Sequence, residues 1–156
     1  MTGTSSGLRP VTTFDEVLLS AFVDLLSTAN GAWISSGLAV TLPGPGTYEV
    51  TATLHTAIST NPSSGDYLIA INGRLFNVTA GAAVLGSQYT VQQNGDNNPS
   101  SFQVDSDLSS FTKFVTVTAP TTIRLEVNRI NTSGTPVATT GLQVSNTRLA
   151  FKKISD

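Results

Sequence analysis

The fold is decided by the stretch Thr47-Tyr-Glu-Val-Thr-Ala-Thr-Leu-His-Thr-Ala-Ile58, in which apolar and polar side chains alternate. Its even positions are mostly apolar, and its odd positions carry threonine, glutamate, histidine and one alanine. Successive side chains of a β-strand point to opposite faces, so this alternation separates the residues into a core-facing set and a solvent-facing set. The stretch therefore predicts a strand with one face buried.

The same alternation recurs on both sides of this strand. Leu38, Val40 and Leu42 precede it, and Pro43-Gly-Pro-Gly46 supplies a stiff turn between the two strands. Residues 111–119 and 123–128 alternate in the same way near the C-terminus. Short strands separated by turn signals predict an all-β protein, specifically a single-domain antiparallel β-sandwich over residues 14–156.

Two further features bear on the middle and the end of the chain. Residues 67–71 form a continuous apolar run, and the Asn72-Gly73 pair after it predicts a hairpin turn. Leu142 and Val144 alternate in one phase, whereas Leu149 and Phe151 alternate in the other. One regular strand cannot keep both pairs on its buried face, so we expect a bulge or bend within residues 145–148.

The segment from Phe14 to Ala29 fits two structures. Its apolar residues form a helical stripe, and Thr13 and Glu16 have the spacing of a capping box, which would allow one short N-terminal helix. The alternative is two short strands, at residues 17–19 and 22–26. The residues alone leave both open, and the family resemblance described below favours the strands.

Composition excludes several functions. The chain has 156 residues, of which 39% are hydrophobic and only 12% charged, and its net charge is −2, so it lacks the cationic footprint that nucleic-acid binding requires. No apolar run approaches the length that spans a membrane. The absence of cysteine excludes disulfides, thiol catalysis and cysteine-ligated zinc. Residues 1–13, rich in glycine, serine and threonine, predict a flexible N-terminal arm without a signal peptide.

Catalytic and metal-binding candidates are few. His55 is the only histidine, it lies in the middle of a strand, and no nucleophile elbow accompanies it, so we predict a non-enzymatic protein without a cofactor. Asp105 and Asp107 sit two residues apart and, with Asp96, are the weak alternative for a calcium site. We expect these carboxylates to be solvated and to bind no metal.

The order of the segments resembles a known family, the tumour-necrosis-factor and complement-globular-head jelly rolls. The segments that carry the resemblance are Leu42–Val50 with its Pro-Gly-Pro-Gly-Thr-Tyr run, Tyr67–Gly73, Phe114–Val127 and the ending Ser145–Phe151. Residues 32–48 are also similar to segments of bacteriophage virion proteins with this fold. The resemblance implies a homotrimer that binds or scaffolds other proteins, and it covers roughly residues 33–154.

The candidates for a subunit interface are aromatic. The resemblance selects Tyr48, Tyr67, Phe114 and Phe151, and Trp33 is a further candidate. Phe114 is the most informative of them, since it interrupts a threonine-rich strand face and must be covered either by another segment or by another subunit.

These features favour a bacteriophage capsid decoration or cement protein that trimerises and stabilises the shell. Its partner would be the major capsid protein, and it would lie on the capsid surface of the virion after synthesis in the host cytoplasm. The alternative is the receptor-binding tip of a tail or head fibre, in which loops 59–66, 94–101 and 131–141 would bind a cell-surface glycan. An enzyme is the least favoured class.

Overall fold

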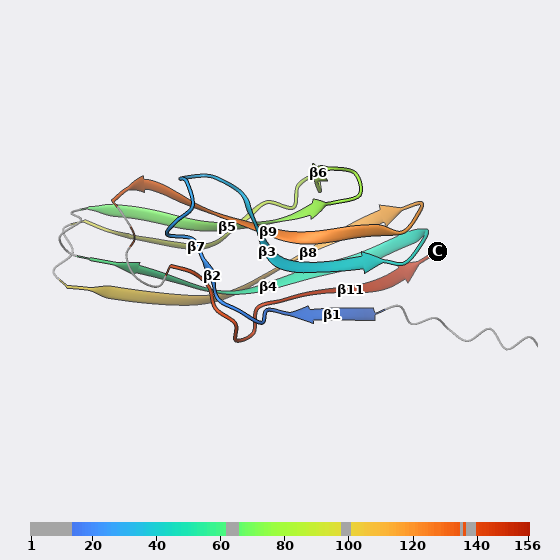
Figure 1. Ribbon diagram of the computed structural model, residues 1–156, viewed down its shortest axis with the longest axis horizontal. Helices are drawn as coiled ribbons and strands as arrows, with labels where there is room; N and C mark the ends of the chain where they lie inside the picture. The colour runs from blue at the N-terminus through green and yellow to red at the C-terminus, as the bar shows by residue number, and fades with distance from the viewer. Residues whose placement is uncertain (1–13, 62–65, 98–100, 135, 137–139) are drawn as a thin grey trace, which may run out of the picture.

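The computed structural model describes residues 14–61, 66–97, 101–134, 136 and 140–156. Over these residues the chain forms two antiparallel sheets packed face to face, with no helix (Figure 1). The predicted all-β, single-domain sandwich is therefore confirmed. No helix long and apolar enough to cross a membrane occurs in the described part of the chain.

Each sheet combines strands from distant parts of the sequence. Sheet A contains β1 (Phe14–Leu18), β2 (Val23–Asp24), β4 (Gly46–Thr60), β8 (Gln103–Val117), β10 (Gly141–Leu142) and β11 (Arg148–Ser155). Sheet B contains β3 (Ile34–Leu42), β5 (Tyr67–Asn77), β6 (Ala82–Ala83), β7 (Tyr89–Asp96) and β9 (Thr121–Ser133).

The eight long strands pair in a nested order. The first pairs with the last (β1 with β11), the second with the last but one (β3 with β9), and so on through β4 with β8 and β5 with β7. Pairing of β4 with β11 and of β5 with β9 then completes the two sheets. A long hairpin rolled up in this way is a jelly roll, the fold that the family resemblance implies.

The core lies between the sheets and follows the predicted alternation. Leu54 on β4, Ile71 on β5 and Leu125 on β9 are completely buried. The even positions of β4 face inward, and the 15-residue ladder between β4 and β8 carries this alternation along the length of the sandwich. The two sheets therefore share one continuous hydrophobic core.

The hairpin predicted at Asn72-Gly73 is wrong, because both residues lie inside β5. The Asn72 side-chain amide donates to Asn128 Oδ1 at 2.9 Å, and its Oδ1 accepts from Thr90 at 2.8 Å. A Cβ on Gly73 would lie only 3.1 Å from the ring of Phe111 in the opposite sheet. The glycine serves close packing rather than a turn, a use that the dipeptide alone does not distinguish.

The N-terminal segment forms strands rather than a helix. β1 pairs with β11 over five residues, and β2 adds to β10. This places Phe14 and Leu18 on the surface, whereas Leu19 and Leu25 enter the core. The helical alternative fails because the edge of sheet A supplies the backbone partners that a helix would otherwise provide.

The phase change near the C-terminus has the predicted cause. β10 ends at Leu142, β11 begins at Arg148, and the link between them contains Asn146 with a positive φ of 65°. The bend returns Leu149 and Phe151 to the buried face, as the sequence requires.

Replacing Leu54 by alanine should lower the free energy of unfolding by about 2–5 kcal/mol, because it removes a fully buried side chain and leaves a cavity. Leu85, which is 95% exposed, is the matched control, and Leu85→Ala should change stability by less than about 0.5 kcal/mol. Urea denaturation measures both values. Equal losses in the two variants would contradict the assignment of the core.

Candidate subunit interface

The outer face of sheet A is flat and rich in hydroxyl groups. Odd residues of β4 and even residues of β8 point away from the core and lie opposite one another. Cross-strand hydroxyl hydrogen bonds join Thr47 to Thr116 (3.0 Å), Thr51 to Thr112 (2.8 Å) and Ser110 to Thr53 (2.9 Å). Because these hydroxyls satisfy one another, this part of the face is polar through neutral groups.

Four large apolar side chains interrupt this face. They are more than half exposed and come from β1 and β8: Phe14, Leu18, Leu108 and Phe114, with Val104 at 52% as a further one near the start of β8. Phe14, Lys152, Glu49 and Phe114 form one cross-strand row, so an aromatic ring stands at each end of it. Large apolar side chains exposed on a polar surface are candidates for contact with another molecule.

Charges on the same face are mixed in sign. Arg148 forms an ion pair with Glu16 at 3.5 Å, and Lys152 lies opposite Glu49 in the register. A shallow depression runs between these residues, with Phe14 and Thr51 also in its lining. The face therefore offers no field of one sign that would repel a second copy of the chain.

The free edge of β8 adjoins this face. β8 pairs with β4 along one side, and no described strand pairs with its other side. Phe102 and Val104 are about half exposed near the start of β8, and the ring of Tyr89 stacks on Phe111 at 4.8 Å along the same edge. An unpaired strand edge is a template for association unless something covers it.

Three of the predicted interface aromatics belong to the chain's own core. Tyr48 is completely buried, its hydroxyl donates to the Gly44 carbonyl at 2.9 Å, and its ring meets Phe151 edge-on at 5.7 Å. Phe151 and Tyr67 are also buried, and the Tyr67 hydroxyl donates to Gln103 at 2.7 Å.

Phe114 is exposed on sheet A, whereas Trp33 is half-buried and contacts Arg74 of sheet B. A role of these residues between subunits stays a prediction. Sequence reasoning missed Phe14, Leu18 and Leu108 as surface residues. The signal for the first two exists only in the pairing of β1 with β11, which turns them toward solvent.

His55 and the acidic residues occupy ordinary polar surroundings. His55 Nδ1 lies 3.0 Å from both the carbonyl and the hydroxyl oxygens of Ser145. Asp105 accepts a hydrogen bond from the Asn94 amide, and Gln103 donates to Asp96 at 3.5 Å. Within the described ranges, no three histidine or carboxylate side chains lie close enough to hold a metal ion.

The strand ends that flank the three loops predicted for glycan binding lie at the same end of the sandwich (Figure 1). Thr60 bridges to Pro136 there, which brings the ends of two of these loops together. A hollow beside them is lined by Tyr67, Leu68, Gly95, Asp96, Asn97 and Ser133. Residues 62–65, 98–100, 135 and 137–139 lie outside the described residues, as does the predicted arm, residues 1–13.

Comparisons with known proteins identify the fold. No protein-family model and no curated protein sequence matches the chain. Among solved structures it is similar to infectious bursal disease virus, Gx strain, with a TM-score of 0.52, 12% identity and coverage of 90% of this chain and 32% of the other. It is also similar to the VP2 subviral particle of infectious bursal disease virus, with a TM-score of 0.51, 11% identity and coverage of 97% and 36%.

A third solved structure is the tumour necrosis factor Eiger from S. frugiperda, with a TM-score of 0.39, 16% identity and coverage of 92% and 86%. The chain spans about a third of the length of the two viral chains that it matches. The similarity to the viral chains and the nested strand order together confirm the jelly roll.

Replacing Phe151 by alanine should cost about 3–5 kcal/mol of unfolding free energy, because its ring packs inside the core. Phe114→Thr introduces the residue type found at neighbouring outward-facing positions of β8. It should change the free energy of unfolding by less than about 0.5 kcal/mol. Both are measured by urea denaturation at protein concentrations low enough for association not to contribute. A loss at Phe114 as large as that at Phe151 would show that Phe114 packs within one subunit.

Proposed function

We propose that the chain is a virion structural protein, a bacteriophage capsid decoration protein that forms a homotrimer and stabilises the shell by binding the major capsid protein. The observation that carries the proposal is the set of apolar side chains Phe14, Leu18, Leu108 and Phe114 on a flat, hydroxyl-rich face. The proposed role is binding and scaffolding rather than catalysis.

The outer face of sheet A has the properties of an interface between copies. Fully burying one leucine or phenylalanine contributes roughly 1.5–3 kcal/mol, so covering these four side chains is a substantial driving force. A stable interface buries roughly 800 Å² on each partner, about a tenth of this chain's accessible surface of 8293 Å². One sheet face and the neighbouring β8 edge are large enough to supply that area.

The surface chemistry also favours self-association. Only 12% of the residues are charged, and the ion pair between Glu16 and Arg148 leaves little unbalanced charge beside the apolar residues. Copies packed at high density on a shell avoid the repulsion that a highly charged surface would create. Paired threonine hydroxyls on β4 and β8 also leave few unsatisfied groups to be desolvated.

The capsid part of the proposal rests on fold. Two of the solved structures that resemble this chain are of infectious bursal disease virus and of its VP2 subviral particle, and a fold-level likeness is an analogy rather than a demonstration of function. In this proposal the capsid contact is made by residues 1–13, which precede β1 and carry the small polar residues of an adaptable arm. The protein would lie on the capsid surface of a virion assembled in the host cytoplasm.

A receptor-binding tip is the second candidate. The observation that favours it is that the strand ends flanking three loops meet at one end of the sandwich, beside the hollow lined by Tyr67 and Asp96. In that role the same trimer would present its loop ends to a cell-surface glycan. Binding of the isolated protein to a glycan array, abolished by replacing residues at these loops, would favour this function over shell stabilisation.

Light scattering should give a mass of about three times 16.2 kDa for the intact protein. The double variant Leu108→Ser/Phe114→Ser should shift this mass toward the monomer, because it removes apolar area from the proposed contact while leaving the core intact. Leu85→Ser is the matched control on an exposed residue outside sheet A and should stay trimeric. A monomeric wild-type protein would refute the trimer.

Deleting residues 1–13 should reduce the occupancy of capsid shells from the phage that encodes the chain, measured by co-sedimentation. The protein should remain a trimer, with a mass three times that of the shortened chain, because the deleted residues precede β1 and the sheet A face remains. Undiminished occupancy would show that the arm does not make the capsid contact. Loss of the trimer would instead place the arm within the subunit interface.

A further inference from the structure

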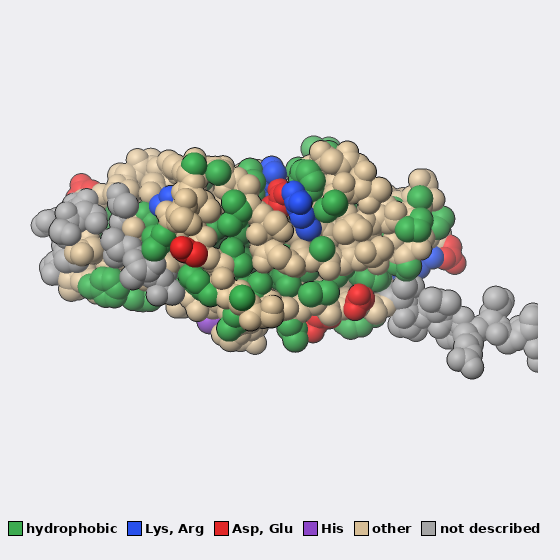
Figure 2. Space-filling view, in the orientation of Figure 1, with side chains coloured by type: hydrophobic (Ala, Val, Ile, Leu, Met, Phe, Trp, Pro, Cys, Tyr) green, Lys and Arg blue, Asp and Glu red, His purple; other side chains and the backbone are tan. Residues whose placement is uncertain are grey.

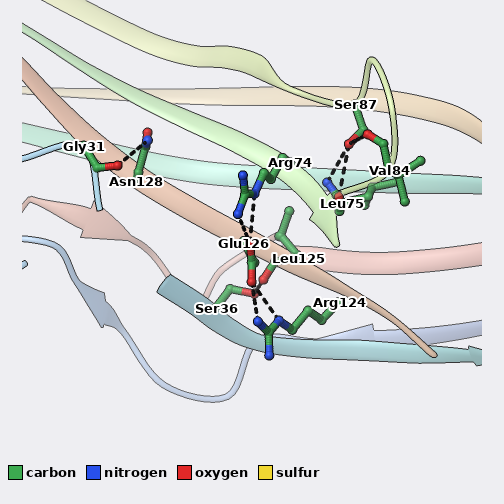
Figure 3. Close-up of polar contacts among 10 residues, drawn as sticks. All are labelled: Gly31, Ser36, Arg74, Leu75, Val84, Ser87, Arg124, Leu125, Glu126 and Asn128. Atoms are coloured by element: carbon green, nitrogen blue, oxygen red, sulfur yellow. Dashed lines mark hydrogen bonds and ion pairs between the residues drawn. The ribbon is translucent and has the colours of Figure 1, made fainter. Parts of the chain in front are cut away.

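The outer face of sheet B carries a cluster of three charged side chains, Arg74, Glu126 and Arg124 (Figure 3). Arg74 on β5 lies opposite Glu126 on β9, and Arg124 is two residues away on the same face of β9. The Arg74 Nε donates to Glu126 Oε2 at 2.9 Å, with Nη2 2.7 Å from the same oxygen. Arg124 Nε donates to Oε1 at 2.9 Å, and its Nη2 contacts the same oxygen.

Each of the two guanidinium groups also lies over an aromatic ring. The Arg74 guanidinium lies 4.2 Å from the ring centre of Trp33, and that of Arg124 lies 4.6 Å from Phe76. Trp33 follows a segment held against β9, where Asn128 donates to the Gly31 carbonyl at 3.2 Å. Two arginines are therefore fixed in place before any ligand arrives, which reduces the entropy cost of binding.

The charges of this cluster do not balance. Glu126 is 3% exposed and carries one negative charge, whereas two guanidinium groups contact it, which leaves a local excess of one positive charge. The chain has only eight lysines and arginines in all, so two on one carboxylate is a marked concentration. In Figure 2, basic and acidic side chains lie together near the upper middle of the view, where most surrounding side chains are neutral.

Glu126 also uses only some of the N–H groups of the two arginines as hydrogen-bond donors. Each arginine has five N–H groups and directs its Nε and Nη2 atoms at Glu126. The Nη1 atoms of both have no partner among the residues that the structure describes. The side chains of Arg74 and Arg124 remain 21% and 34% exposed, so these donors are within reach of solvent.

A purely structural role accounts for only one of the two arginines. Arg74 alone neutralises Glu126 and stacks on Trp33, which clamps the segment before β3 onto sheet B. Arg124 contacts neither Trp33 nor that segment, and its aromatic partner Phe76 lies on the neighbouring strand. A second, partly desolvated cation adds repulsion unless it has a counter-ion.

We propose that Arg124 forms a binding site for a single oxyanion, a carboxylate or sulfate group, held by the guanidinium donors that it directs away from Glu126. The anion supplies the charge that balances the cluster. Guanidinium groups suit such ligands because their planar donor pairs match two oxygens of one group. The oxyanion is either free or carried on a sugar ring, whose apolar face would contact Phe76 beside Arg124. The site is separate from the sheet A surface, so it stands whether or not the chain forms a trimer.

Titrations of the intact protein with sodium sulfate, sodium glucuronate and glucose test the site by NMR, at constant ionic strength maintained with chloride. Sulfate or glucuronate should bind saturably with a dissociation constant of about 1 mM, while glucose should not bind. Equal affinity for the two anions identifies the free oxyanion as the ligand. Tighter glucuronate binding shows that the sugar ring contributes.

Three variants link binding to the cluster. Arg124→Gln should weaken binding at least about tenfold. Arg124→Lys keeps the positive charge but loses the planar pair of guanidinium donors, so it should weaken binding less. Glu126→Gln should strengthen binding, because it removes the competing negative charge, an effect that a merely structural ion pair would not produce. Lys153→Gln, which removes a cation near the C-terminus, should leave the affinity within about twofold.

The proposal fails if neither anion binds saturably to the wild-type protein. It also fails if a folded Arg124→Gln protein binds as tightly as the wild type, or if Lys153→Gln weakens binding equally. Thermal unfolding of each variant establishes that it is folded. If Arg124→Gln does not fold, the affinity of Arg124→Lys tests the site instead.

Discussion

The antiparallel ladder between β4 and β8 is the constraint on which the rest of the structure depends. The two strands pair over 15 residues without a shift, and this one register determines, for every residue along them, whether its side chain points into the core or to the surface. Sliding this ladder by one position would turn Leu54 and Val50 to solvent and bring Thr51 and Thr53 into the core. The hydrophobic effect therefore selects one register, and that register also determines what the outer face displays.

The two outer faces of the sandwich differ because different strands cover them. On sheet A the odd residues of β4 and the even residues of β8 face outward, so threonine hydroxyls pair across the strands around exposed apolar residues. On sheet B the outward residues of β5 and β9 bring Arg74, Arg124 and Glu126 together under the segment that carries Trp33. One face therefore displays apolar side chains among paired hydroxyls, and the other displays two guanidinium groups on one carboxylate.

The alternation of apolar and polar residues predicted the strands correctly. The sequence was misleading where one local pattern is compatible with two different structural roles. The buried positions of β4 and the bend before Arg148 follow directly from the pattern of apolar residues. Asn72-Gly73 was mistaken for a turn because its role comes from Phe111, a residue of the opposite sheet. Among the interface candidates, the sequence could not separate the buried Tyr48 from the exposed Phe114, since aromatic residues serve both cores and contacts.

By itself the sequence determined the fold class, the strand alternation and the low charge of the surface, because each follows from residue type and spacing along one strand. Only the tertiary structure decided which residues from distant strands meet. Phe14 joins Phe114 on one face through the pairing of β1, β11, β4 and β8, and Arg124 shares a carboxylate with Arg74 through the pairing of β5 and β9. Such contacts depend on strand order and register, which arise from burying the whole core at once rather than from any single segment.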